Sequence, residues 1–155
     1  MTKRDAPDIV IYPPLAAVLA TLVAFSLHAV WPLNILPKEG FVNLAGWLAV
    51  GGALWLVSGA ARAFRQVGTP VSPRKTPMGL ATTGPYKTTR NPMYLGMVLG
   101  LVGIGFLGAI DWAVFLAFGL WAVLHYGVVL REEAYLREKF GHEYTEFLGS
   151  SRRWF

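Results

Sequence analysis

Two polar stretches of the sequence contain the residues best suited to chemistry, and each borders a long apolar run. The first is residues 84–96, GPYKTTRNPMYLG, in which Arg90 precedes an Asn91-Pro92 pair. Asn accepts hydrogen bonds well just before a helix and Pro suits its first position, so we expect a helix to begin at Pro92. The free N–H groups of that helix start, together with Arg90, are suited to bind a carboxylate or a phosphate. The alternative is that Arg90 anchors the chain at lipid headgroups.

The second stretch follows another apolar run and opens with two carboxylates, Glu132 and Glu133, beside Arg131. A carboxylate near the hydrocarbon of a membrane is costly unless it is paired, and is therefore a candidate functional residue. The alternative is a salt bridge to Arg131 or to arginines of the loop 65–91. If the two stretches lie at the same membrane depth, they could bind a zwitterion, with its carboxylate at Arg90 and its ammonium at the glutamates.

The composition indicates that lipid surrounds the elements that must position these residues. Hydrophobic residues make up 54% of the chain and charged residues only 15%, whereas soluble domains carry about 25% charged residues. The formal net charge of +5 therefore fits a membrane surface better than a nucleic acid, and we expect no nucleic-acid partner. The absence of cysteine excludes disulfides, thiolate nucleophiles and cysteine-ligated metals, and we expect no metal site.

Apolar runs of about 20 residues, the length that crosses a bilayer, predict four membrane-spanning helices. They cover approximately residues 9–31, 41–64, 92–110 and 112–130. We therefore expect an all-α fold: a polytopic membrane protein with about four transmembrane helices and a C-terminal amphipathic interfacial helix. That last helix is predicted from apolar residues that share one helical face, namely Leu136, Phe140, Tyr144 and Phe147. Gly141 is expected to break or kink it.

The third span is rich in glycine, and Gly96 and Gly100 form a GxxxG pair. Small residues allow helix backbones to approach closely, which favours helix association in lipid. We therefore expect a close-packed helix face, with room for a ligand against the backbone as the alternative. The sequence leaves the oligomeric state open.

The distribution of cations predicts how the spans are oriented. With four spans, both termini and the loop 65–91 lie on one side of the membrane. Of the 14 Lys and Arg residues, only Lys38 falls on the other side, and Lys3 and Arg4 near the N-terminus belong to the majority. Because cytoplasmic segments are enriched in Lys and Arg, we expect both termini and the loop with the candidate site to be cytoplasmic.

The stretches GPYKTTRNPMYLG and, further along the chain, REEAYLREKFGHEYTEF resemble two related kinds of membrane methyltransferase. These are isoprenylcysteine carboxyl methyltransferase and phosphatidylethanolamine N-methyltransferase, and the resemblance covers roughly residues 68–155. It implies a single membrane methyltransferase domain over residues 1–155. Residues 1–64 would supply two N-terminal spans, and residues 65–155 the half that binds the cofactor, S-adenosylmethionine.

The resemblance also implies which residues bind that cofactor. The matching residues are Tyr86, Arg90, Asn91, Pro92, Tyr94 and Gly96 in the turn, with Glu132 and Glu133 as the acidic pair. Gly103-Ile104-Gly105 corresponds loosely to a Gly-x-Gly of the phospholipid enzymes. His125 and Tyr126 either line the pocket or pack in the core. Asn91 stands where prenylcysteine enzymes usually carry His, so the turn is more similar to the phospholipid enzymes.

These inferences predict an integral membrane enzyme that transfers a methyl group from S-adenosylmethionine to a lipophilic acceptor taken from the bilayer. The acceptor would be a prenylcysteine-like carboxylate or a phospholipid amine. Arg90 and Glu132 are the candidate catalytic residues. A carboxylate acceptor needs no base, whereas a protonated amine could lose its proton to Glu132 or Glu133.

Two other classes of protein stay open as alternatives. One is a sterol-reductase-like membrane enzyme that uses NADPH, although such enzymes are usually longer. The other is a small four-span transporter without catalytic activity. Such transporters rely on an acidic residue inside a span, and the first three predicted spans contain none.

Overall fold

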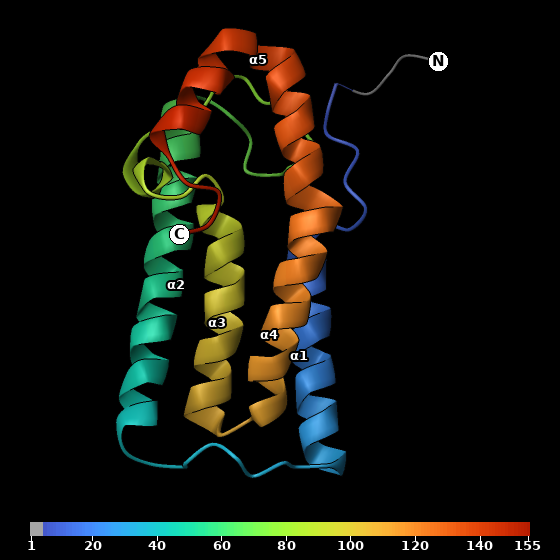
Figure 1. Ribbon diagram of the computed structural model, residues 1–155, viewed down its shortest axis with the longest axis vertical. Coiled ribbons are helices and arrows are strands. Elements are labelled where there is room, and N and C mark those ends of the chain that lie inside the picture. The colour runs from blue at the N-terminus through green and yellow to red at the C-terminus, as the bar shows by residue number, and fades with distance from the viewer. Residues whose placement is uncertain (1–4) are drawn as a thin grey trace.

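The computed structural model describes residues 5–155, so that Lys3 and Arg4 lie outside the described residues. The secondary structure of the described part is helical (Figure 1), apart from one isolated β-bridge between Thr89 and Arg152. In chain order the helices are α1 (Pro13–Val30), α2 (Phe41–Gln66), the short 3-10 helix η1 (Gly84–Lys87), α3 (Pro92–Gly108), α4 (Asp111–Leu124), the π-helical turn η2 (His125–Val129) and α5 (Leu130–Ser150). The predicted all-α fold is confirmed.

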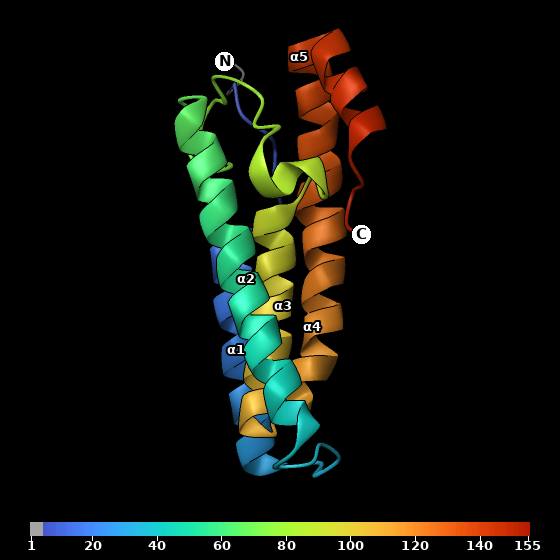
Figure 2. The same ribbon diagram turned by 90° about the vertical axis from the view of Figure 1, so that its left-hand side faces the viewer.

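The four long apolar segments lie alongside one another as a bundle. α1, α2 and the continuous segment from α4 to α5 are each long and apolar enough to cross a membrane, and α3 is a shorter apolar helix of 17 residues. α2 packs on α3, α3 on α4 and α4 on α1 (Figure 1, Figure 2). The α1–α2 and α3–α4 connections lie at one end of the bundle, while the loop 67–91 and the outer part of α5 lie at the other (Figure 1).

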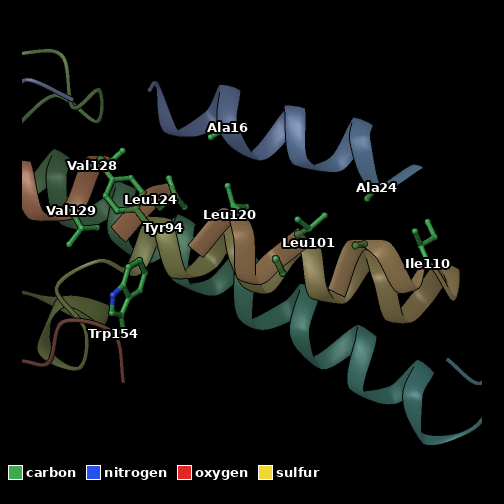
Figure 3. Packing of buried hydrophobic residues seen from close by; sticks show 12 residues of the cluster. Ala16, Ala24, Tyr94, Leu101, Ile110, Leu120, Leu124, Val128, Val129 and Trp154 are labelled. Atoms are coloured by element: carbon green, nitrogen blue, oxygen red, sulfur yellow. The ribbon is translucent and has the colours of Figure 1, made fainter. Parts of the chain in front are cut away.

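The core of the bundle is formed where large side chains of one helix meet small ones of another. Leu120 and Leu124 of α4 are buried, and Ala16 of α1 packs in the same cluster (Figure 3). Large apolar side chains also cover the outside of the bundle: Trp47 is 66% exposed and Phe118 is 71% exposed. A continuous apolar exterior of this kind requires lipid rather than water around it.

The glycines of α3 bring it close to α2. A Cβ added at Gly96 would lie 2.7 Å from Val57 Cγ2 and 3.1 Å from the Ala53 carbonyl oxygen. A Cβ at Gly103 would lie 2.7 Å from Val50 Cγ2. Only glycine allows this approach, so the predicted close-packed helix face is confirmed, and its partner is α2 of the same chain.

α4 and α5 form one continuous rod that is interrupted twice. At η2 the Leu130 N–H donates to the His125 carbonyl, five residues back, and the Gly127 carbonyl accepts a 3.0 Å hydrogen bond from the Val10 N–H. At Gly141 the backbone adopts φ 52° and ψ −117°, a conformation that is easily reached only by glycine. The kink expected at Gly141 is therefore present, and the chain beyond it turns back towards the bundle (Figure 1).

The C-terminal helix packs its apolar face against its own chain. Tyr144 and Phe147, beyond the kink, are buried in a cluster with Ala60 and Ala63 of α2 and with Tyr86 of η1. The predicted amphipathic helix is thus present, and the side that was expected to face the membrane interface covers the loop end of the bundle.

The N-terminal segment 5–12 ties the loop end together from the other side, and we call it the N-terminal strap. The Asp5 carboxylate accepts hydrogen bonds of 2.7 Å from both Tyr135 and Lys139 of α5. The Thr76 hydroxyl of the long loop donates to the Asp5 carbonyl at 2.6 Å. The strap therefore links α1, the long loop and α5 over the region where the candidate site residues lie.

Candidate active site

One cavity at the loop end of the bundle brings most of the predicted site residues together. Its walls are the strap and first turn of α1, the loop 69–81, η1, the first turns of α3, and α5 on both sides of its kink. The predicted site residues that line it are Tyr86, Arg90, Asn91, Tyr94, Glu132 and Glu133. Pro92 and Gly96 do not line it; Pro92 is buried at the start of α3 and Gly96 packs on α2.

α3 begins at Pro92 as predicted, with Asn91 in the capping position. The Asn91 side chain does not accept a hydrogen bond from the helix start, so the predicted capping role is wrong. Its amide nitrogen donates instead to the Arg153 carbonyl at 2.9 Å, and the Asn91 N–H donates to the Thr89 hydroxyl at 3.3 Å. The C-terminal tail offers an acceptor that competes for the side chain.

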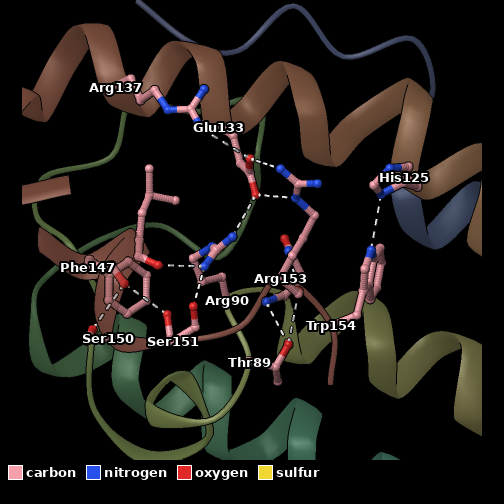
Figure 4. Close-up of polar contacts among 12 residues, drawn as sticks. Thr89, Arg90, His125, Glu133, Arg137, Phe147, Ser150, Ser151, Arg153 and Trp154 are labelled. Carbon is pink, nitrogen blue, oxygen red and sulfur yellow. Dashed lines mark hydrogen bonds and ion pairs between the residues drawn. The ribbon is translucent and has the colours of Figure 1, made fainter. Parts of the chain in front are cut away.

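Glu133 lies at the centre of a cluster of arginines (Figure 4). It is 4% exposed, and its two carboxylate oxygens accept hydrogen bonds of 2.8 and 2.9 Å from Nε and Nη2 of Arg153. Arg90 and Arg137 approach the same carboxylate at 3.5 and 3.8 Å. The salt bridge considered as an alternative role is therefore present at Glu133, whereas Arg131 pairs with Asp8 at 3.7 Å.

Glu132, the next residue, has a different environment. Its carboxylate accepts a 2.7 Å hydrogen bond from the Tyr94 hydroxyl, and no Lys, Arg or His of the described chain lies within salt-bridge distance of it. Burial, together with the Glu132 charge, raises the pKa of Tyr86 well above its ordinary value, so that the Tyr86 phenol stays protonated. Among residues 5–155, Glu132 is therefore a carboxylate that lines the cavity without a cationic partner.

Arg90 is held inside the protein rather than at the lipid headgroups, which contradicts the headgroup-anchor alternative. Its side chain is 11% exposed, and its Nη1 donates to the carbonyls of Leu148 and Ser151 at the end of α5. Its Nε is buried without a hydrogen-bond partner among residues 5–155. Arg90 thus lines the cavity as a cation that the end of α5 holds in place.

Two further sets of residues singled out by the sequence lie outside the cavity. His125 stacks on Trp121 with ring centroids 5.3 Å apart, and its Nδ1 accepts a 3.1 Å hydrogen bond from Trp154 Nε1. Tyr126 is exposed on the outer face. Gly103 and Gly105 pack against α2 and α4, so the Gly-x-Gly of α3 does not reach the cavity.

The residues that sequence reasoning missed belong to the C-terminal tail. The Arg90 N–H donates to the Arg152 carbonyl at 2.8 Å and the Arg152 N–H to the Thr88 carbonyl at 3.3 Å. Arg153 and Trp154 then reach Glu133 and His125. The one available signal was the pairing of basic and aromatic residues in the final RRWF, which also fits an interfacial anchor.

The charges and contours of the cavity define what it can bind. Its charged lining includes Arg90, beside the start of α3 where the first N–H groups have no intrahelical partner, and Glu132, which is bonded to Tyr94. The rest of the lining is mostly apolar and includes Met93 and Met97. No group of three or more His, Asp or Glu residues in the described chain could hold a metal ion. The arrangement fits a small molecule with both charges and an apolar body.

The fold and site define an all-α membrane protein with a ligand cavity at one end of its bundle. Residues 41–143 match the phospholipid methyltransferase family, and the chain belongs to this family of membrane methyltransferases. The match includes α2, the Arg90 turn and both glutamates, but neither α1 nor the C-terminal tail. No curated protein matches the sequence. Membership in this family separates the chain from the reductase and transporter classes.

Proposed function

We propose that the protein is an S-adenosylmethionine-dependent methyltransferase that modifies the amine of a phospholipid at the cytoplasmic face of a membrane. The observation that carries this proposal is the meeting of Arg90, the start of α3 and Glu132 in one cavity. These groups present opposite charges to the two ends of an amino-acid zwitterion, which is the part of S-adenosylmethionine that distinguishes it from other nucleotides.

The residues of the cavity fit this cofactor. Arg90, which lines the cavity, and the N–H groups at the start of α3 would hold the methionine carboxylate. Glu132 would hold the ammonium group, since Tyr94 uses only one of its carboxylate oxygens. When bound, the cofactor supplies a methyl group on a positively charged sulfur, so the protein need only orient the reactants and exclude water.

Glu133 is not proposed as an ammonium ligand. Its two oxygens are taken by Arg153, with Arg90 and Arg137 close by, and a fourth cation would find no free acceptor. This divides the acidic pair of the sequence into two roles: Glu132 faces the ligand, and Glu133 orders the arginines.

Two features support a lipid amine as the acceptor. The family that the chain matches is that of phospholipid methyltransferases, and Asn91 occupies the position where the resemblance places His in prenylcysteine enzymes. Apolar lining from Pro13, Pro14 and Met97 offers a surface for a lipid that enters from the bilayer between helices. The water-soluble cofactor would enter from the loop side.

The test is methyl transfer by the purified protein in lipid nanodiscs, with methyl-labelled S-adenosylmethionine as donor. Nanodiscs of phosphatidylethanolamine are expected to become labelled, while nanodiscs of phosphatidylcholine alone, and a farnesylcysteine analogue added to them, are not. Label in the farnesylcysteine alone would refute the amine acceptor but keep the methyltransferase. A rise in thermal stability with NADPH, and none with S-adenosylmethionine, would refute the cofactor, because a ligand selective for the folded state raises stability.

A further inference from the structure

The C-terminal tail, residues 151–155, packs against the turn before α3, which carries Arg90 and Asn91 of the cavity lining. Its backbone is bonded to the turn before α3 in both directions, through Arg90 N–H to Arg152 O at 2.8 Å and Arg152 N–H to Thr88 O at 3.3 Å. Thr89 and Asn91 both donate to the Arg153 carbonyl, at 3.2 and 2.9 Å. The tail is thereby fixed in register with the residues that carry the proposed anion site.

From this register we propose that Arg153 is a positioning residue, which acts through Glu133 to hold the Arg90 guanidinium ready for the carboxylate of the methyl donor. The inference rests on the proposed function and deepens it. Arg153 itself does not line the cavity, so its effect must pass through the group that it touches.

The geometry of the cluster explains how this works. Arg153 satisfies both oxygens of Glu133 at 2.8 and 2.9 Å in the parallel, two-bond arrangement that is strongest for arginine and carboxylate. Arg90 stays at 3.5 Å from the same carboxylate, which is longer than a charge-assisted hydrogen bond. Arg153 therefore forms the two strong hydrogen bonds with Glu133 that Arg90 would otherwise form.

The charge of the cluster has a second consequence. Three guanidinium groups, of Arg90, Arg137 and Arg153, surround one buried carboxylate, Glu133, which leaves two positive charges in excess. Such a site attracts an anion, and Arg90 is the member of the cluster that lines the cavity along with Glu133. Without Arg153, Glu133 would take Arg90 as its partner, and the Arg90 guanidinium would turn away from the ligand.

The experiment compares Arg153→Gln with Arg152→Gln, its matched control. The two variants lose the same charge from neighbouring positions, but the Arg152 side chain is exposed and forms no salt bridge in the described structure. For Arg153→Gln we expect the affinity for S-adenosylhomocysteine to fall roughly tenfold, the effect of one misplaced charge-assisted hydrogen bond, with KM for the donor rising and kcat unchanged. For Arg152→Gln the affinity for S-adenosylhomocysteine and the KM for the donor should equal those of the wild type.

A double variant tests whether Arg153 acts through Glu133. In a Glu133→Gln background, Arg153→Gln should cause no further loss, because the two residues form one unit. Arg153→Lys, which keeps the charge but lacks the planar fork, should show a smaller loss and serves if Arg153→Gln does not fold. Unchanged affinity in both Arg153 variants, or additive losses in the double variant, would overturn the inference. If the wild type binds no S-adenosylhomocysteine, the proposed function itself is wrong and the inference fails with it.

Discussion

Replacement of Glu132 by Gln is the sharpest test of how the cavity recognises its ligand. The variant keeps the size of the side chain and an oxygen that can accept the hydrogen bond from Tyr94, which is 2.7 Å in the wild type. It removes only the negative charge. Since Glu132 has no cationic partner in the described chain, no arginine or lysine is left unpaired by the change, and we expect the fold to be preserved.

The size of the effect follows from the kind of bond that is lost. A hydrogen bond to a charged group contributes about 1.5–3 kcal/mol and one between neutral groups about 1 kcal/mol. The difference, roughly 0.5–2 kcal/mol, corresponds to about a 2- to 30-fold loss of affinity. Isothermal titration of S-adenosylhomocysteine into wild type and variant in the same detergent measures it directly. Glu138→Gln, an exposed position on the same helix, is the matched control and should bind like the wild type.

A second ligand makes the reasoning refutable even if the variant binds weakly for an unrelated reason. Methylthioadenosine lacks the amino-acid part, so Glu132→Gln should bind it as tightly as the wild type does. Equal losses for both ligands would show that the cavity has been distorted, and no loss for either would discard Glu132 as the ammonium ligand. If Glu132 were instead a general base, kcat at saturating donor would fall by about 100-fold or more while the affinity for S-adenosylhomocysteine stayed the same.

Three further predictions concern the framework of the site. Gly96→Ala should lower the thermal midpoint in detergent, since its Cβ would lie 2.7 Å from a side chain of α2 and overpacking costs about 1–3 kcal/mol. Gly100→Ala is the control and should leave the midpoint unchanged, because its Cβ would lie 3.7 Å from the nearest atom, an ordinary contact distance. Equal midpoints for the two variants would refute the packing argument. The chain lacks cysteine, so single introduced cysteines report topology. Ser72→Cys should react with an impermeant maleimide only in inside-out vesicles, and Glu39→Cys only in right-side-out vesicles. Labelling of both cysteines from one side would contradict the orientation. Hydrogen bonds from Lys139 and Tyr135 lower the pKa of Asp5 below its ordinary value, so these bonds persist above about pH 4 and are lost as the pH falls further. Hydrogen exchange of the N-terminal strap, corrected for the intrinsic rate, should then accelerate below about pH 4 in the wild type and be fast at every pH in Asp5→Asn; a pH-independent wild type would show that Asp5 does not anchor the strap.

The sequence was sufficient for the features that depend on neighbouring residues. The apolar runs predicted the long helices, Asn91-Pro92 predicted the start of α3, and Gly141 predicted the kink. These are local effects of hydrophobicity, proline geometry and glycine freedom, and each can be judged within a few residues of the chain.

The features that the sequence did not predict depend on contacts between distant residues. Glu132 and Glu133 are adjacent and chemically alike, but successive residues of an α-helix point about 100° apart, so one meets Tyr94 and the other meets the arginines. Glu133 pairs with Arg153, which lies twenty residues further along the chain. The kink at Gly141 turns the chain back and so brings Arg153 to Glu133. The Asn91 side chain was misjudged for the same reason, because its partner is a carbonyl of that returning tail.

The π-helical turn at His125–Val129 sets a limit on how this chain can change. A π turn holds one more residue than the α-helix it interrupts, and this one lies between α4 and Glu132. Deleting one residue there would restore an uninterrupted α-helix and rotate everything downstream by about 100°. This would move Glu132 away from Tyr94 and Glu133 away from Arg153, and withdraw the Gly127 carbonyl from Val10. Among related sequences that keep the function, deletions in this stretch should therefore be far rarer than substitutions. One deletion would rotate the downstream helix, which displaces both glutamates and breaks the attachment of the segment before α1 in a single event.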